Sequence, residues 1–320
     1  MSAKYRDRLP QLHGKQCLSD GGLETHLIFN EGYDLPMFAA FTLLQEEAGR
    51  QALDRYMRRF AKIALRDGRG LLLDTPTWRA SARWAKDIEI SIDTLARLHC
   101  EAVELLHDLR TELETPASPF VVNGVIGPQD DGYNPQAFMN RNVAQIYHGQ
   151  QVDWFAALDV DMISAITMTY VEEAIGITNA CAEVRMPVVI SFTVETDGRL
   201  PSGQRLGEAI EQVDAEAVLA PAYYMINCAH PDHFADVLTG NPAWLSRVMG
   251  VRANASRMSH EELDAAEELD EGNPQELGGH YRQLAGIFPS LTVMGGCCGT
   301  DHRHIDAISK ACLHADVTAA

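Results

Sequence analysis

Three cysteines of this sequence have the type and spacing needed for sulfur chemistry at a metal. Cys297 and Cys298 are adjacent and bracketed by glycine in the sequence GGCCGT, and Cys228 ends an apolar stretch in the sequence INCAH. Three protein ligands with an exchangeable fourth position are typical of catalytic zinc, whereas structural zinc sites usually have four protein ligands. A thiol bound at the fourth position would be held as a thiolate, which can attack an activated methyl group.

Spacing alone leaves two other interpretations of the cysteine pair open. An adjacent pair can be ordinary core packing, or Cys297 and Cys298 can form a redox pair. Adjacent residues of a regular strand point to opposite faces, so both sulfurs converge only where the backbone leaves strand geometry, which flanking glycines permit. The other cysteines lie singly in apolar surroundings and are expected to be buried thiols: Cys17, Cys100, Cys181 and Cys312.

Short, nearly continuous apolar segments alternate along the chain with longer segments of helical periodicity. Continuous apolar character is typical of strands that are covered on both faces. We expect strands at residues 16–20, 70–75, 120–127, 161–167, 187–194, 222–228, 247–251 and 291–296. We expect helices at residues 43–67, 92–113, 135–158, 171–184, 207–218, 231–238, 274–288 and 301–313, the first ending at Gly68. This alternation predicts an α/β fold, a (β/α)8 barrel that occupies residues 1–320 as one domain.

Barrels of this kind place their sites at the C-terminal ends of the strands. The expected sixth strand ends at Cys228 and the eighth leads into Cys297, so the three sulfurs are expected to meet at one rim. A third strand end carries Asp20-Gly21-Gly22. A glycine-rich turn exposes backbone N–H groups to a carboxylate, and an aspartate can meet an ammonium group. Taken alone, the same residues also suit a tight strand–helix turn.

Composition excludes several partner classes. The chain has 320 residues, with 26 Lys and Arg against 45 Asp and Glu and a formal net charge of −19. This acidic balance argues against nucleic acid or an anionic membrane surface as the main partner. No secretory signal is evident, and no apolar run approaches the ~20 residues that span a bilayer. The odd number of cysteines, 7, fits a reducing cytoplasm better than a disulfide framework.

Residues 259–272, SHEELDAAEELDEG, form a strongly acidic segment after the seventh expected strand. We expect a solvated loop or a short helix there, with a lid or a docking surface as the alternative. Trp78 and Trp84 follow the second expected strand. They either pack at the barrel rim or line a pocket for a cationic methyl donor through cation–π contacts.

The sequence resembles the homocysteine S-methyltransferase family. The resemblance rests on DGGLET from Asp20, on Asn227-Cys228 and on GGCCGT, with weaker matches in TPTWRAS from Thr75 and in Gly127-Pro128. It covers about residues 18–305, nearly the whole chain. It implies a (β/α)8 barrel in which homocysteine binds zinc through sulfur and attacks a methyl donor to give methionine.

The resemblance also implies site residues. Zn2+ would be held by Cys228, Cys297 and Cys298. Substrate binding is assigned to Asp20, Gly21 and Thr75, and to Asn227 and Gly296, which directly precede expected ligands.

One position departs from the family pattern. Family members usually carry a Glu-Thr pair at the end of the fourth strand, where the Glu contacts the substrate amino group, but this chain has Ile166 and Thr167. Losing such an ion-paired hydrogen bond commonly costs ~1.5–3 kcal/mol. Either another acid takes over, with Glu195 and Asp197 as candidates, or the substrate lacks a free ammonium group at that point.

The sequence therefore predicts a cytoplasmic, zinc-dependent S-methyltransferase whose partners are a small-molecule thiol and a methyl donor, with no nucleic acid or membrane. Relatives use S-methylmethionine, S-adenosylmethionine, a betaine or a methylfolate. No folate or corrinoid module is evident, so we expect a small free sulfonium or ammonium donor. The alternative is a zinc- or thiol-binding barrel subunit that has lost homocysteine turnover, as Ile166 suggests. A redox protein using Cys297 and Cys298 is a third hypothesis. The sequence does not indicate the oligomeric state.

Overall fold

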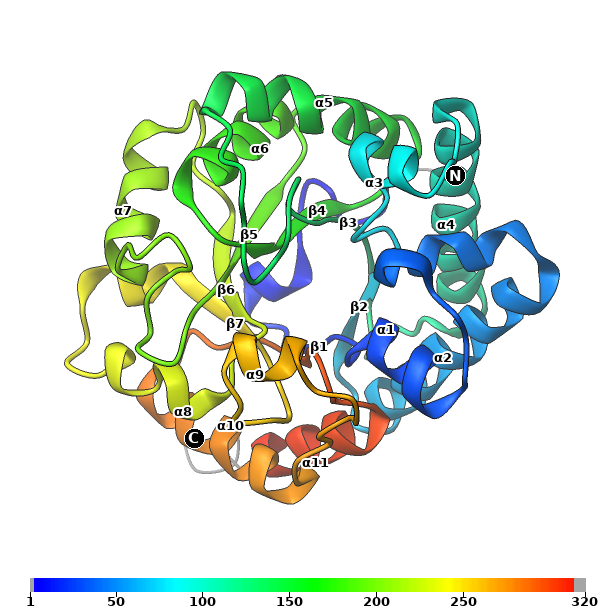
Figure 1. Ribbon diagram of the computed structural model, residues 1–320. Coiled ribbons are helices and arrows are strands. Elements are labelled where there is room, and N and C mark those ends of the chain that lie inside the picture. The colour runs from blue at the N-terminus through cyan, green and yellow to red at the C-terminus, as the bar shows by residue number, and fades with distance from the viewer. Residues whose placement is uncertain (1–2, 314–320) are drawn as a thin grey trace.

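The computed structural model describes residues 3–313 and shows, over that range, a closed barrel of eight parallel strands surrounded by helices (Figure 1). The strands follow one another around the barrel in chain order, and β8 closes onto β1. This architecture confirms the predicted (β/α)8 barrel. The outermost residues of the expected domain, 1–2 and 314–320, lie outside the described range.

Each expected strand segment overlaps an observed strand, and only the ends differ. The strands are β1 (Cys17–Leu18), β2 (Gly70–Asp74), β3 (Phe120–Ile126), β4 (Met162–Met168), β5 (Val188–Thr193), β6 (Tyr223–Asn227), β7 (Val248–Ala253) and β8 (Val293–Gly296). Their side chains are buried almost throughout, because helices cover the barrel outside and side chains fill it inside. The continuous apolar pattern therefore has the structural cause that was expected.

Every expected helical segment also overlaps a helix, and residues 92–113 coincide with α4. The α-helices are α1 (Leu23–Thr25), α2 (Glu47–Arg66), α3 (Ala82–Asp87), α4 (Ile92–Leu113), α5 (Arg141–Ala157), α6 (Val171–Glu183), α7 (Leu206–Glu216), α8 (Pro231–Phe234), α9 (His260–Asp264), α10 (Pro274–Ile287) and α11 (His302–Leu313). The sequence pattern missed α1 and α3, which are too short to show a helical period. Gly68 follows α2 with φ 61°, the left-handed conformation expected of a C-terminal glycine.

Side-chain direction alternates along the strands and separates two apolar layers. On β2, Leu71 and Leu73 pack outward beneath the helices, whereas Leu72 packs inside the barrel. At the C-terminal mouth the inward positions become polar, with Asp74 ending β2 and Arg252 near the end of β7, both buried. The apolar interior thus supports a polar floor on which a site can be built.

The acidic segment 259–272 contains the expected short helix, α9. Ser259 caps it, accepting from the backbone N–H of Glu262 while the Glu262 side chain accepts from the Ser259 N–H. Further along, the Glu271 carbonyl oxygen lies 2.8 Å from His304 Nε2 on α11. The segment is therefore fixed against the barrel rim beside β8.

Most of the isolated cysteines are buried as expected: Cys17, Cys181 and Cys312. Cys100 is only half-buried on α4, and its Sγ lies 3.5 Å from the Glu104 carboxylate. Among residues 3–313, no helix is both long and apolar enough to cross a membrane.

Candidate metal and substrate site

The two adjacent cysteines lie in a tight turn directly after β8. The Cys297 carbonyl oxygen accepts hydrogen bonds from the Thr300 N–H, at 3.1 Å, and from the Thr300 hydroxyl, at 2.7 Å. Gly299 has φ 78°, which a residue with a side chain rarely adopts at this point of a turn. A Cβ on Gly296 would lie only 2.0 Å from Thr300 Oγ1. Strand β8 ends at Gly296, and the backbone turns over the next four residues, where Gly299 takes the left-handed conformation.

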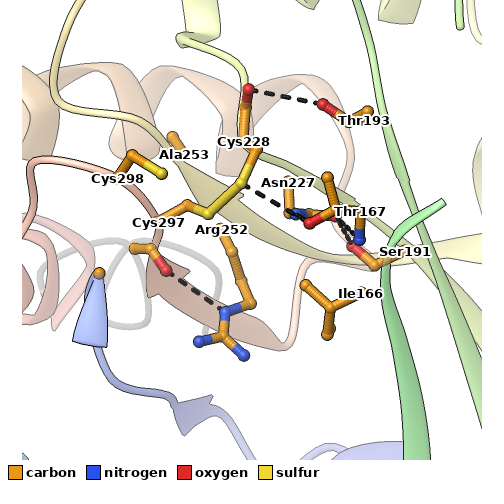
Figure 2. Close-up of a disulfide and its surroundings, with 12 residues drawn as sticks. Ile166, Thr167, Ser191, Thr193, Asn227, Cys228, Arg252, Ala253, Cys297 and Cys298 are labelled. Carbon is orange, nitrogen blue, oxygen red and sulfur yellow. Dashed lines mark hydrogen bonds between the residues drawn. A yellow bond between two sulfur atoms is a disulfide. The ribbon is translucent and has the colours of Figure 1, made fainter. Parts of the chain in front are cut away.

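Cys228 is held at the end of β6 by its backbone. Its φ is 53°, a left-handed conformation that is uncommon for residues other than glycine. Its N–H donates to the Arg252 carbonyl at 3.1 Å, and its own carbonyl oxygen lies 2.8 Å from His260 Nε2 on α9. These contacts direct the sulfur toward the β8 turn (Figure 2).

Asn227, which directly precedes Cys228, joins β6 to β4 and β5 through side-chain hydrogen bonds. Its Oδ1 accepts from the Thr167 N–H at 3.0 Å and from the Ser191 hydroxyl at 2.6 Å, and its Nδ2 donates to Thr167 Oγ1 at 2.8 Å. Thr167 needs this partner because the β4–β5 register shifts between Ala165 and Met168. Asn227 is fully buried and is absent from the cavity lining, so its side chain lies behind the site, where it supports Thr167.

The three sulfurs form one cluster, which we call the sulfur wall: Cys228, Cys297 and Cys298. Their sulfur atoms lie within 4.8 Å of one another. Cys228 and Cys297 are joined as a disulfide, while Cys298 is free (Figure 2). The disulfide departs from the expectation of reduced thiols. It also pairs residues of different strands, whereas the redox hypothesis paired Cys297 with Cys298.

Cys298 faces an aromatic side chain from the loop after β3. Tyr133 Oη lies 3.2 Å from Cys298 Sγ, and the Tyr133 ring stacks on the His260 ring at 4.0 Å between centroids. Burial raises the pKa of the Cys298 thiol above its ordinary value. A buried thiol is ionised readily only beside a positive charge, so a cation bound here would supply what the protein lacks.

Beside the sulfurs is a cavity of about 190 Å³. Opposite charges meet on its floor, where the buried guanidinium of Arg252 forms ion pairs with Asp20 and with Asp74. Arg252 Nε also donates to the Gly296 carbonyl at 3.3 Å, which joins this floor to the β8 turn. Burial alone would lower the pKa of Arg252, but Asp74 and Asp20 hold it above its usual range. Burial raises the pKa of Asp20 to about 7, so the two carboxylates give the group a net negative charge only above that pH.

Glu24 on α1 adds another carboxylate to the cavity lining. Burial raises the pKa of Glu24 to about 7. Apart from its own backbone N–H, no residue within 3–313 donates a hydrogen bond or forms an ion pair to this carboxylate. We call Asp20, Glu24 and Asp74 the acid wall.

The remaining wall is apolar and aromatic. Ile166 lines the cavity, and Trp78 Nε1 donates to the Ile166 carbonyl at 3.2 Å. The Arg79 guanidinium carbon lies 4.2 Å from the Trp78 ring centroid and 3.8 Å from that of Trp84. The chain's own cation thus stacks on both rings, and Trp84 is not part of the lining. The interpretation of these rings as a cage for a cationic donor is not supported.

The structure brings most of the expected site residues together. The cavity is lined by the expected ligands and by four of the expected substrate residues: Cys228, Cys297, Cys298, Asp20, Gly21, Thr75 and Gly296. The two acids proposed to compensate for Ile166 lie elsewhere. Glu195 contacts His260 Nδ1 at 3.0 Å, and Asp197 is exposed and paired with Arg199.

Sequence reasoning missed several cavity residues: Glu24, Asp74, Arg79, Tyr133 and Arg252. One signal was available. Arg252 interrupts the apolar strand VMGVRA, and a charged residue in a buried strand needs a buried partner.

Comparison with known proteins agrees with this geometry. The model of the homocysteine S-methyltransferase family matches residues 17–312. The chain belongs to the homocysteine S-methyltransferase family. Membership confirms the resemblance seen in the sequence and makes the protein a methyltransferase, with the sulfur wall as its candidate metal site.

Solved structures show the same fold. The homocysteine methyltransferase MmuM from Escherichia coli, in its oxidized form, matches with a TM-score of 0.74 at 18% identity, covering 94% of this chain and 98% of that one. Its metallated form matches with a TM-score of 0.72 at 18% identity and the same coverage. The apo form gives 0.65 at 20% identity, covering 93% and 96%. No curated protein sequence gives a significant match.

Proposed function

We propose that the protein is a zinc-dependent enzyme that transfers a methyl group from a small sulfonium or ammonium donor to homocysteine, giving methionine, or to a related thiol. The observation that carries the proposal is the sulfur wall, with three cysteine sulfurs within 4.8 Å of one another beside a small cavity. Family membership supports the acceptor, and the chemistry of the donor atoms supports the metal.

The donor set fits zinc. Cys228, Cys297 and Cys298 would hold the ion through sulfur, and three soft ligands from two strand ends leave room for a substrate atom. Bound zinc would hold the acceptor thiol as a thiolate, so no protein general base is required. Because disulfide sulfurs are not thiolate ligands, the bond between Cys228 and Cys297 must be reduced before the site can hold metal.

The protein's own residues would orient the acceptor. We propose that Asp20, Gly21, Thr75 and Gly296, which all line the cavity, surround the amino acid portion. The Asp20 and Asp74 pairs with Arg252 give this floor a fixed geometry. A rigid floor beside the sulfurs holds the acceptor in one orientation, which lowers the entropy that must be lost in the transition state.

Charge and size favour a small cationic donor. The cavity lining contains five acids, Asp20, Glu24, Asp74, Asp131 and Asp264, against two arginines, Arg79 and Arg252. Where these acids are ionised, their negative charge exceeds the positive charge of the two arginines and attracts sulfonium or quaternary ammonium compounds. Its volume of about 190 Å³ is below the ~300–1,000 Å³ usual for drug-sized ligands, which favours S-methylmethionine or a betaine over S-adenosylmethionine or a methylfolate.

Metal analysis combined with a donor panel tests the proposal. Protein purified under reducing conditions is expected to hold about one zinc per chain and to form methionine from homocysteine with a small cationic donor. S-methylmethionine, a betaine, S-adenosylmethionine and a methylfolate would each be supplied separately. Less than about half an equivalent of zinc together with no methionine from any donor would refute the proposal.

The second candidate is a zinc- or thiol-binding barrel subunit without turnover. It is favoured by Ile166, an apolar side chain that lines the cavity where the family pattern has a carboxylate. This candidate predicts zinc and homocysteine binding but no methyl transfer with any of the four donors. The same experiment therefore separates the two functions.

A further inference from the structure

The acids that line the cavity differ in whether another residue already forms an ion pair or hydrogen bond with their carboxylate. Asp20 and Asp74 are paired with Arg252. Asp131 accepts from the Tyr133 backbone N–H at 2.8 Å and is paired with a guanidinium, and Asp264 is exposed at the rim. Only Glu24, among the described acids of the lining, combines a position inside the cavity with a carboxylate that no other residue binds.

Arg79 and Arg252 attract the Glu24 carboxylate without forming an ion pair or hydrogen bond with it, so the carboxylate still has room for a positively charged partner. Removing a carboxylate from water is costly unless a cation or hydrogen-bond donors compensate for the lost hydration. An α-amino acid acceptor carries such a cation, its ammonium group. In homocysteine that group is separated from the sulfur by three carbon atoms, so both ends fit one small cavity.

We propose that Glu24 binds the ammonium group of the acceptor and selects thiols that carry an α-amino group. This inference rests on the proposed methyltransferase function and names the acceptor class of the same site. It relocates the ammonium contact from the end of β4, where Ile166 stands, to α1.

The connections of α1 support this assignment. The Gly22 N–H donates to the Thr300 carbonyl at 3.0 Å, and the Gly299 N–H donates to Thr25 Oγ1 at 3.2 Å. Both contacts join the α1 segment to the turn that carries Cys297 and Cys298. These contacts fix the position of Glu24 relative to the sulfurs. A fixed separation is needed if Glu24 is to select ligands by the distance between their thiol and ammonium groups.

Among the described residues, the wall formed by Ile166 and Trp78 offers no group that would do the same. Ile166 and Trp78 face the cavity with apolar atoms, and the Trp78 N–H is already bonded to the Ile166 carbonyl. Glu195 is bonded to His260 outside the lining. An ammonium group placed on that side would lose hydration without gaining a partner.

Binding of two thiols to the reduced, zinc-loaded protein tests the assignment. L-homocysteine carries the ammonium group, and 4-mercaptobutanoate is the same molecule without it. Calorimetry on wild-type protein is expected to show tighter binding of homocysteine. Glu24→Gln, which keeps the shape and removes the charge, is expected to weaken homocysteine about 10- to 100-fold while changing 4-mercaptobutanoate less than about threefold. Zinc content should stay unchanged.

Glu261→Gln is the matched control, because it makes the same change of charge at an exposed position of α9 outside the cavity lining. It is expected to change neither thiol's affinity. Equal losses for both thiols in Glu24→Gln, or an unchanged preference for homocysteine, would overturn the assignment, as would a loss confined to the methyl donor. If wild-type protein binds neither thiol, the proposed function itself fails and the assignment falls with it.

Discussion

The sulfur wall and the acid wall belong to one cavity, but different interactions hold their side chains in place. The sulfurs are positioned by the backbone, through the turn after β8 and the left-handed conformation of Cys228. The paired acids are positioned by side chains, because Asp20 and Asp74 meet on the guanidinium of Arg252. The backbone fixes a donor set that admits little variation.

The largest effect is expected from removing one sulfur. Cys298→Ala leaves two protein ligands, so the reduced protein should lose stoichiometric zinc and more than about 100-fold of its methyl-transfer rate. Elemental analysis and a methionine assay measure both. Cys181→Ala, which removes a buried thiol from α6, should keep zinc and activity. Full zinc and activity in Cys298→Ala would show that the sulfur wall is not the metal site.

The second-largest effect is expected on stability, from removing the Arg252 guanidinium that pairs with two residues of the acid wall. Arg252→Met leaves Asp20 and Asp74 buried without their partner, which should lower the free energy of unfolding by about 3–5 kcal/mol. Urea denaturation of the reduced, zinc-free protein measures the change. Arg257→Met breaks exposed ion pairs only and should cost less than about 1 kcal/mol. Equal small losses in both variants would mean that the floor does not depend on this pairing.

A smaller loss of stability is expected from removing the Asn227 side chain, whose hydrogen bonds support the strand end that carries Cys228. Asn227→Ala leaves the Thr167 N–H buried without an acceptor and should lower the free energy of unfolding by about 1–3 kcal/mol. Because Thr167 Oγ1 also lies 3.8 Å from Cys228 Sγ, methyl transfer should fall as well. Asn142→Ala, on the exposed side of α5, should stay within about 0.5 kcal/mol of wild type. If Asn227→Ala changed neither the free energy of unfolding nor methyl transfer, the backbone alone would position Cys228.

The two walls also differ in how far the sequence predicts them. The sulfurs could be predicted because all three follow buried strands, and because Cys297 and Cys298 are flanked by glycines that the turn requires. The floor of the acid wall could not, because Arg252 lies 178 positions from Asp74 and 232 from Asp20. Local pattern carries no information on such pairs. For the same reason the sequence places Asn227 at the substrate, whereas its side chain binds Thr167 on β4 and Ser191 on β5.

The barrel itself was predictable for a different reason. Its strands are covered on both faces, so each one is a continuous apolar run bounded by turn residues. The short helices α1 and α3, of three and six residues, escaped prediction because they are too short to show a helical period. That omission also concealed Glu24, which stands in the recognised sequence DGGLET but reaches the cavity only through the fold of α1.

The smallest effect is expected from restoring the carboxylate of the family pattern. If Glu24 already binds the ammonium group, Ile166→Glu adds a second acid on an apolar wall. The homocysteine KM should then change by less than about threefold, because the acceptor carries a single ammonium group and Glu24 already binds it. Ile166→Val serves as a control for the change in packing. A gain of more than about tenfold in homocysteine activity would instead indicate that the natural chain lacks an ammonium contact, and it would favour the subunit without turnover.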